Sequence, residues 1–323
     1  MHIYNNKIFA SSIRRHQIAY KTLFIAILIL INFSTLLSQS VQSSSARFLV
    51  LSDWGGFASN NQKAVAEAMA KEALNIEAQF VVTVGDKYHV DGINSATDSR
   101  WKTEFEDVYS HPSLQIPWYP SLGNHDYRGD VESQIEYSKL STRWKLTSRY
   151  YTQKERIDDS SFVLIVHLYT SPFIEKYRIE FAVYHLEDQN AKKQIVWLDS
   201  VLTVSNEKGT IVVGHHSIYA AASNHGNTKE LIEQVLPILT KHNVPLYICG
   251  HYHVMQHLKN GKIDFVVCGG GMEAGTVDER DDVVFGAGSL GFLSVIATVK
   301  ELRVNIINEQ NTTLQSILLP VEK

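Results

Sequence analysis

The chain of 323 residues is 44% hydrophobic and 20% charged, which excludes a disordered, collagen-like or multi-span membrane protein. Its net charge is −4, but the first 40 residues contain four basic side chains, Lys7, Arg14, Arg15 and Lys21, and no acidic one. The remaining chain has 26 basic and 34 acidic residues, and therefore a net charge of −8. A chain this acidic has no general attraction for a phosphate backbone, so we expect no nucleic-acid partner.

The N-terminal segment has the pattern of a secretory signal peptide. An apolar stretch at 22–37 follows the basic residues, and the small residues Ser38 and Ser40 suit a signal peptidase. The uninterrupted apolar run of about 10 residues is short against the ~20 that a membrane-spanning helix needs, although an uncleaved anchor is the alternative. We therefore expect a signal peptide at 1–40, one domain at 41–323, a secreted or periplasmic location, and no stable membrane insertion after cleavage.

From residue 47 onward, short β-rich runs alternate with polar helical segments, which is typical of a layered α/β fold. The predicted elements in chain order are a strand at 47–52, a helix at 61–74, strands at 80–84 and 118–122, a helix at 133–140, a strand at 161–168, a helix at 189–201, a strand at 210–213, a helix at 228–241, strands at 246–249 and 264–267, and a closing antiparallel meander at 292–299, 301–308 and 314–319. No linker rich in proline, glycine or serine divides the chain, so we expect a single domain.

Five of the predicted strands end in side chains of the types that bind metals. In chain order these side chains are Asp53; Asp86 and His89; Asn124, His125 and Asp126; His215 and His216; and His251 and His253. Ligands of an open sheet collect beyond the carboxyl ends of its strands, so the five loops can converge on one place. Glycines precede four of the clusters and allow a sharp turn and a close approach to the backbone.

The number of candidate ligands indicates two metal ions. The seven side chains are Asp53, Asp86, His89, Asn124, His215, His251 and His253. A zinc-like centre uses only three or four ligands, whereas sharing Asp86 divides the seven into two sets of four. Carboxylates and imidazoles without a thiolate suit zinc, iron or manganese. Paired metal ions are a recognised device for hydrolysing phosphate esters, and the sequence predicts such a hydrolase.

The motifs D-W-G-G, G-D-x-x-H, G-N-H-D, V-x-G-H-H and G-H-x-H occur in this order between Asp53 and His253. With them the chain resembles the calcineurin-like metallophosphoesterase superfamily, and within it the small, single-domain purple (tartrate-resistant) acid phosphatases. The resemblance implies an α/β (α+β) fold, a four-layer αββα sandwich of two mixed β-sheets flanked by helices, so that 41–323 is a single catalytic domain. It also implies an acid phosphatase that hydrolyses phosphomonoesters by attack of a metal-bound hydroxide on phosphorus.

The same resemblance implies a role for each site residue. Asp53, Asp86 and His253 would bind the first metal, normally ferric iron. Asp86 would bridge to a second metal (Zn, Mn or Fe), which would also take Asn124, His215 and His251. His125 and His225 are the implied catalytic residues: His125 would hydrogen-bond the phosphate and His225 would donate a proton to the leaving group. Together with Asn124 they form the implied substrate-binding set.

The chain departs from the family pattern in its second motif. His89 stands where the family has a tyrosine, and Lys87 stands where asparagine is usual. Tyrosinate favours Fe(III) and gives the purple colour, whereas neutral imidazole does neither. We therefore expect His89 to bind the first metal, which puts Fe(III) there in doubt and favours Zn, Mn or Fe(II). Lys87, if it points into the cleft, would attract anionic substrates, and Asp126 is a candidate for orienting a catalytic histidine.

Two other functions fit the same motifs. One is a phosphodiesterase or nucleotide pyrophosphatase on the same scaffold, and the other is a non-catalytic scaffold protein, which the departures in the second motif suggest. The expected partner is a small phosphate-ester substrate, and the expected oligomeric state is a monomer. Cys249 and Cys268 lie in apolar strand-like runs, where they would form either two buried thiols or one disulfide.

Overall fold

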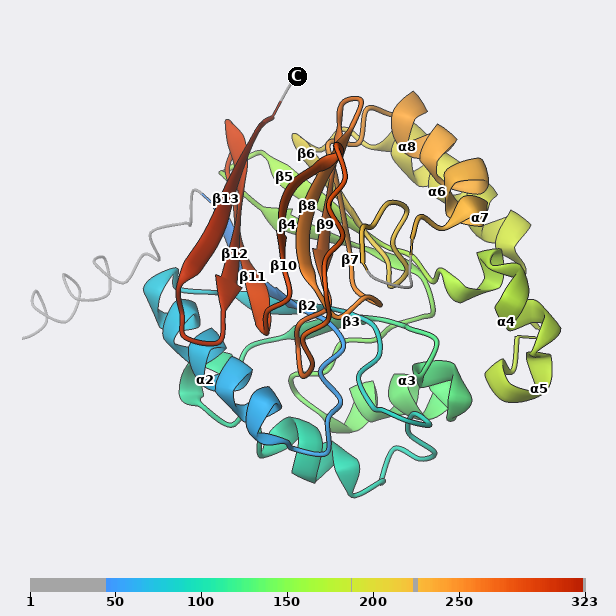
Figure 1. Cartoon of the computed structure of the whole chain (residues 1–323), viewed down its shortest axis with the longest axis vertical. Coiled ribbons are helices and arrows are strands. Elements are labelled where there is room, and N and C mark those ends of the chain that lie inside the picture. Colours follow the sequence, from blue (N-terminus) through green and yellow to red (C-terminus); the bar gives the residue numbers. More distant parts are fainter. Residues whose placement is uncertain (1–44, 187, 223–225, 322–323) are drawn as a thin grey trace, which may run out of the picture. The chain divides into compact units, whose positions relative to one another are not determined.

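Two mixed β-sheets form the centre of the protein in the computed structural model, which describes residues 45–186, 188–222 and 226–321. The strand order of the first sheet is β13-β12-β11-β1-β2-β3, and that of the second is β10-β8-β9-β7-β6-β5-β4 (Figure 1). The first sheet contains β1 (Ala46–Leu51), β2 (Phe80–Val84), β3 (Trp118–Ser121), β11 (Gly291–Ala297), β12 (Glu301–Asn308) and β13 (Thr313–Pro320). The second contains β4 (Tyr151–Arg156), β5 (Phe162–His167), β6 (Gly209–Val213), β7 (Leu246–Cys249), β8 (Met255–Asn260), β9 (Ile263–Cys268) and β10 (Val283–Ala287).

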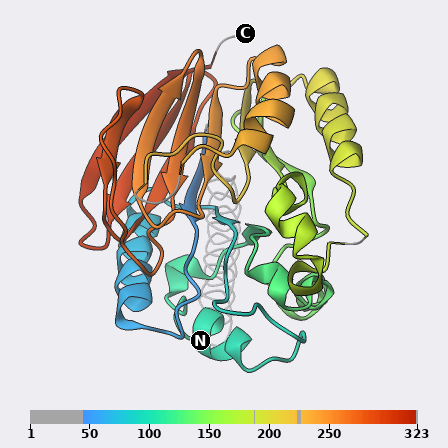
Figure 2. The same ribbon diagram turned by 45° about the vertical axis from the view of Figure 1, so that its right-hand side comes forward.

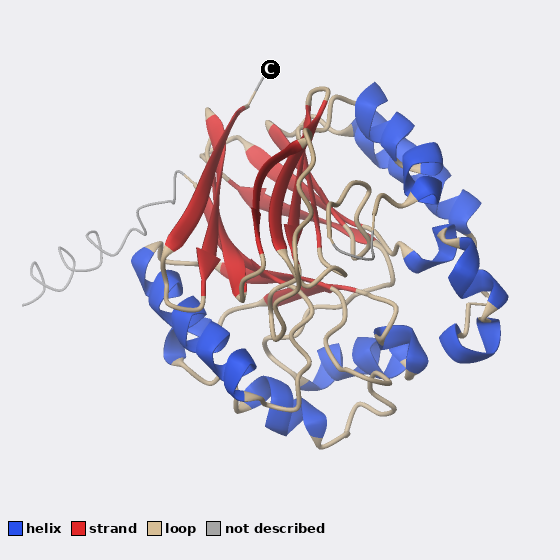
Figure 3. Ribbon diagram, in the orientation of Figure 1, coloured by secondary structure: helices blue, strands red, loops and turns tan. Residues whose placement is uncertain are grey.

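The two sheets pack on each other through one apolar core and are covered by helices on their outer faces. Phe48 and Val82 of the first sheet share this inner core with Val213 and Ile248 of the second, and all four are buried. In Figure 3 the strands lie between two groups of helices, and Figure 2 gives a second view of the same layers. The four-layer αββα sandwich implied by the sequence is therefore confirmed.

The helices are amphipathic and bury one face each. On the first sheet, α2 and α3 contribute to a cluster rich in aromatic residues, and on the second sheet α6, α7 and α8 contribute to a separate aliphatic cluster. The α-helices are α2 (Asn60–Asn75), α3 (Val131–Leu140), α4 (Glu175–Ile179), α5 (Phe181–Tyr184), α6 (Ala191–Val204), α7 (Lys229–Gln234) and α8 (Leu236–Lys241). The shorter helical turns are η1 (Trp101–Glu106), η2 (Pro112–Leu114), η3 (Asp126–Arg128) and η4 (Ser171–Phe173).

The predicted elements are all present, with two kinds of difference. The helix predicted at 228–241 is divided into α7 and α8, because Pro237 lies in the first turn of α8, lacks a backbone N–H and cannot continue a preceding helix. The sequence also missed β4, β8 and β10. Both β4 and β10 are edge strands, and β4 has the polar sequence YTQKER with alternate residues exposed. Such half-solvated strands carry little of the apolar signal that identifies a buried strand.

The topology places the motif loops at one edge of each sheet. β1, β2 and β3 run parallel to one another, and so do β5, β6, β7 and β9. Their carboxyl ends therefore carry the loops after β1, β2, β3, β6 and β7. Hydrogen bonds join the loops of the two sheets directly: the backbone N–H of His251 donates to Asp53 Oδ2 (2.9 Å), and His215 Nδ1 bonds to the carbonyl of Val84 (2.9 Å).

The predicted leader at 1–40 lies outside the described residues. Among the residues that the structure describes, no helix combines the length and the apolar character needed to cross a membrane. Both cysteines are present as free, buried thiols, which decides between the two alternatives left by the sequence.

Candidate metal centre

Two buried carboxylates lie at the centre of the site. Asp53 follows β1 and Asp86 follows β2, and both adopt a left-handed backbone conformation, with φ of 52° and 48°, that turns the side chain away from the strand direction. The two oxygens of Asp86 have different surroundings: Oδ1 accepts a hydrogen bond from the backbone of His125 (2.8 Å), whereas Oδ2 is 3.0 Å from His215 Nε2. Asp86 Oδ2 is thus the atom around which the other donors gather.

The histidine rings surround these carboxylates with one nitrogen each. His89 Nε2 and His125 Nε2 are 3.9 and 4.0 Å from Asp86 Oδ2, and His253 Nε2 is 3.7 Å from Asp53 Oδ1. On the other side, His251 Nδ1 is 3.2 Å from His215 Nε2. The sequence predicted each of these histidines near the site, and the structure brings all five together.

The second nitrogen of three rings is held by the backbone. His215 Nδ1 bonds to the carbonyl of Val84, His89 Nδ1 to that of Gly55 (2.9 Å), and His125 Nδ1 to that of Val90 (2.7 Å). A carbonyl can only accept, so the bonded nitrogen donates a proton to it and Nε2 is the nitrogen that faces the cluster. Rings oriented in this way are prepared for a cation.

Asn124 completes the group and is nearly buried. Its Oδ1 lies 3.2 Å from His215 Nε2, so the amide oxygen faces the same centre as Asp86. His225, the predicted proton donor, lies outside the described residues, so its position relative to these side chains is not part of the described site.

The geometry of the described residues fits a metal centre. Four overlapping groups have ligand atoms within 4.8 Å of one another, and the groups are Asp53, His89 and His253; Asp86, His89 and His125; Asp53, Asp86 and His215; and His215, His216 and His251. In addition, Asp53 Oδ1 is buried without a hydrogen-bond partner among the described residues. A buried carboxylate oxygen without a partner is costly, and a cation would satisfy it.

The cluster is strongly coupled electrostatically in the absence of metal. Burial alone would raise the pKa of Asp86, but the rings of His215, His125 and His89 together outweigh it and hold that pKa well below the usual range. Conversely, burial would lower the pKa of His215, but Asp86 and Asp53 raise it to about 9. Carboxylates that stay ionised while buried among imidazoles suit a site that binds divalent or trivalent cations.

His216 lies beside the centre, and both of its ring nitrogens are bonded to side chains outside the predicted ligand set. Nδ1 bonds to Thr170 Oγ1 (2.8 Å) and Nε2 to the hydroxyl of Tyr177 (3.1 Å), while its ring packs 4.4 Å from that of His251. Burial holds the pKa of His216 well below its usual value, so the ring is neutral. His216 therefore supports the ring of His251 by packing, a role that its sequence position did not reveal.

Two glycines let the loops approach each other. A Cβ at residue 123 would lie 2.2 Å from Asp86 Oδ1, and one at residue 250 would lie 1.9 Å from Ser52 Oγ. Neither position can accept a side chain without displacing a ligand loop. This is the physical reason for the glycines that precede the motif residues.

Lys87 does not point into the cleft. Its ammonium group is completely buried and donates to Asp126 Oδ2 (2.7 Å) and to the carbonyl of Ser121 (2.7 Å). Asp126 Oδ2 also accepts from the backbone N–H groups of Asp86 and Gly123. Lys87 and Asp126 therefore join the loops after β2 and β3 beneath the ligands. The expectation that Asp126 orients a catalytic histidine is wrong, because its bonds go to Lys87, Gln134 and the backbone instead.

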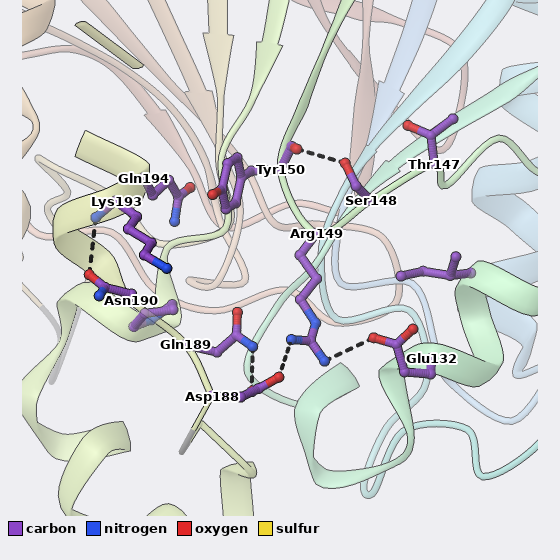
Figure 4. Close-up of a pocket in the computed structure, with 12 residues that line it drawn as sticks. Glu132, Thr147, Ser148, Arg149, Tyr150, Asp188, Gln189, Asn190, Lys193 and Gln194 are labelled. Carbon is purple, nitrogen blue, oxygen red and sulfur yellow. Dashed lines mark hydrogen bonds and ion pairs between the residues drawn. The ribbon is translucent and has the colours of Figure 1, made fainter. Parts of the chain in front are cut away.

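A cavity of about 570 Å³ lies outside this site. It is lined by residues of α3, the 147–150 segment and the start of α6, and Arg149 is joined there to Glu132 and Asp188 (Figure 4). None of the predicted ligands that the structure describes lines this cavity. The chemistry of the chain is therefore concentrated at the ends of the parallel strands.

Comparison with known proteins agrees with this site. Residues 46–255, which include all seven predicted ligands, match the model of the calcineurin-like phosphoesterases. The chain therefore belongs to the calcineurin-like phosphoesterase family, and its cluster of histidines and aspartates fits the dinuclear metal centre that this family implies.

Individual relatives show which members of this family the chain resembles. The chain is 37% identical to purple acid phosphatase 7 of Arabidopsis thaliana over 71% of each chain. It is 34% identical to tartrate-resistant acid phosphatase type 5 of Sus scrofa over 85% of this chain and 86% of that protein. A similar solved structure is GAP50, described as the anchor in the inner membrane complex of Plasmodium, with a TM-score of 0.77 at 21% identity, covering 86% of this chain and 90% of that one. At that identity, the likeness to GAP50 concerns the fold alone.

Proposed function

We propose that the protein is an acid phosphatase that hydrolyses phosphomonoesters. The observation that carries the proposal is the position of Asp86 Oδ2, which lies within 4.0 Å of Nε2 of His215, His89 and His125. One carboxylate oxygen shared by donors from three loops is the arrangement that a pair of metal ions requires. The similarity to purple acid phosphatases supports the phosphomonoester as substrate.

The residues divide into two ligand sets around that oxygen. Asp53, His89 and His253 would hold the first ion and Asn124, His215 and His251 the second, with Asp86 shared. Two bound metals supply an activated water near neutral pH and bind the phosphate oxygens during in-line displacement.

His125 is the side chain best placed to contact the phosphate. Its ring is about one-fifth exposed and is fixed by the carbonyl of Val90, while Nε2 faces the cluster. Burial lowers the pKa of His125, so the ring is mostly neutral near pH 7 and gains a proton as the solution becomes acidic. A protonated His125 would stabilise the negative charge that develops on the phosphate oxygens. His225 remains the proposed proton donor to the leaving alcohol.

We propose that the first site prefers a divalent ion to Fe(III). The donors of this chain are two carboxylates and two neutral imidazoles, and His89 contributes no negative charge. Replacement of His89 by tyrosine should create a visible absorption band that depends on iron. His89→Ala should lower the metal content below two ions per chain, and an unchanged content would remove His89 from the ligand set.

The decisive experiment combines metal analysis of the purified protein with phosphatase assays between pH 4 and 8. We expect two metal ions per chain and faster turnover of p-nitrophenyl phosphate than of bis-p-nitrophenyl phosphate. The reverse preference would favour a phosphodiesterase. Fewer than two metals with no turnover after addition of Zn, Mn or Fe would favour a non-catalytic protein, and an Asp86→Asn variant with full activity would show that the centre lies elsewhere.

The remaining expectations follow from the leader and the charge. We propose an extracytoplasmic protein that acts as a monomer on small phosphate esters and binds no nucleic acid. Tests of these points are cleavage of the leader in a secreting host and the mass of the purified protein in solution.

A further inference from the structure

The segment that follows β9, residues 269–277, is fastened to the loop that carries His253. The carboxylate of Glu273 lies 2.9 Å from His253 Nδ1, and the backbone N–H of Gly275 donates to the carbonyl of His253 (2.5 Å). The backbone N–H of Gly269 donates to the carbonyl of Val254 (3.1 Å). His253 is therefore held from this one segment through both its backbone and its ring.

The run of three glycines explains how the segment reaches the site. A Cβ at residue 269 would lie 2.0 Å from the carbonyl oxygen of Tyr252, and one at residue 271 would lie 2.2 Å from that of Ser52. Only glycine lets the chain pass this close to the loops that carry Asp53 and His253. The glycines thus have a packing role, which corresponds neither to a phosphate-binding loop nor to a free flexible segment.

A contact with α2 fixes the position of the segment next to Glu273. Asn61 Nδ2, in the first turn of α2, donates to the carbonyl of Met272 (3.0 Å). The side chain of Glu273 is 63% exposed, and its hydrogen bond together with this anchored backbone holds it at His253. Backbone interactions therefore place both partners of this hydrogen bond.

The bond also fixes the orientation of the His253 ring. A carboxylate accepts hydrogen bonds, so His253 Nδ1 donates to Glu273, and Nε2 is the nitrogen that faces Asp53 Oδ1, 3.7 Å away. The rings of His215 and His89 instead donate to neutral backbone carbonyls. His253 differs from these two rings because the partner of its Nδ1 is an anion.

We propose that Glu273 is a positioning residue of the first metal site, which orients His253 through the hydrogen bond to its Nδ1. This inference rests on the proposed dinuclear centre. Carboxylates that accept a hydrogen bond from a metal-bound imidazole typically contribute 10- to 100-fold to metal affinity or activity. Because water screens the exposed carboxylate of Glu273, we expect the lower end of that range, about 10-fold.

The test measures metal affinity directly. The wild-type protein, Glu273→Leu, Glu273→Gln and the matched control Glu279→Gln, an exposed glutamate in the same region, are loaded with Zn²⁺ and titrated with a chelator, and the zinc retained per chain is measured. We expect one of the two zinc ions to be released at about tenfold lower chelator concentration in Glu273→Leu, with the second ion unchanged. Glu273→Gln keeps a hydrogen-bond acceptor without the charge and should lie between Glu273→Leu and the wild type.

Two further measurements distinguish a failure of the proposed role of Glu273 from a failure of the proposed function. Equal melting temperatures of the metal-free wild type and Glu273→Leu show that the variant folds, and Co²⁺ loading should give a changed visible spectrum for one ion only. If the wild type binds two zinc ions and Glu273→Leu retains both with wild-type affinity, the role of Glu273 is refuted while the dinuclear centre stands. If the wild type itself binds fewer than two ions, the proposed function fails first.

Discussion

Replacement of Lys87 by methionine should destabilise the protein by about 3 kcal/mol. Lys87 and Asp126 form an ion pair at 2.7 Å with no exposed surface on either side chain. Removal of one partner of such a pair typically costs 3–5 kcal/mol, because the other charge stays buried without compensation. Asp126 would keep three N–H donors, from Asp86, Gly123 and Gln134, so we place the loss near the lower limit.

The assay is urea unfolding of the metal-free protein, so that the free energy of unfolding reports on the ion pair without a contribution from bound metal. Lys102→Met is the matched control, since Lys102 pairs with Asp107 on the surface, with both side chains more than half exposed. Exposed pairs contribute about 0–1 kcal/mol, so this variant should unfold nearly as the wild type does. A loss below 1 kcal/mol for Lys87→Met would refute the reasoning that the pair supports the ligand loops. The double variant Lys87→Met/Asp126→Asn should recover part of the loss.

Three other predictions follow from buried groups. Burial lowers the pKa of His167 to about 3, so the unfolded chain binds a proton that the folded chain does not, and stability is lost as the pH falls from about 6.5 toward 3. The wild type should lose about 2 kcal/mol more than His167→Gln between pH 8 and pH 5, and parallel pH profiles would contradict this. Gly123→Ala should lower the metal content by pushing a methyl group against Asp86, whereas Gly226→Ala, with open space around its Cα, should retain it. Burial raises the pKa of the Cys249 thiol to about 12, so both cysteines should react with a thiol reagent only after unfolding, and rapid labelling of the folded protein would disprove their burial.

The sequence alone predicted the layered fold and the side chains that gather in the His/Asp cluster. Apolar runs that end in Asp53, Asp86 and His215 identify buried strands, and parallel strands present their carboxyl ends at one edge. The glycines before four of the five clusters indicated in addition that the loops approach closely. These signals are local, since each lies within a few residues of its strand, and local signals can be recognised in a single sequence.

The tertiary structure decided the contacts between residues far apart in the chain. The partner of Lys87 is 39 residues away and that of His253 is 20 residues away, and no periodicity or spacing links either pair. The sequence placed Lys87 among possible cleft cations because charged residues are usually solvated, and only packing of the loops after β2 and β3 shows that it is buried. The edge strands β4 and β10 were missed for a related reason: their pairing is satisfied on one side only, so their residues face water and resemble a loop. Short motifs were thus sufficient to predict the members of the cluster, whereas the contacts that orient them depend on the folded chain.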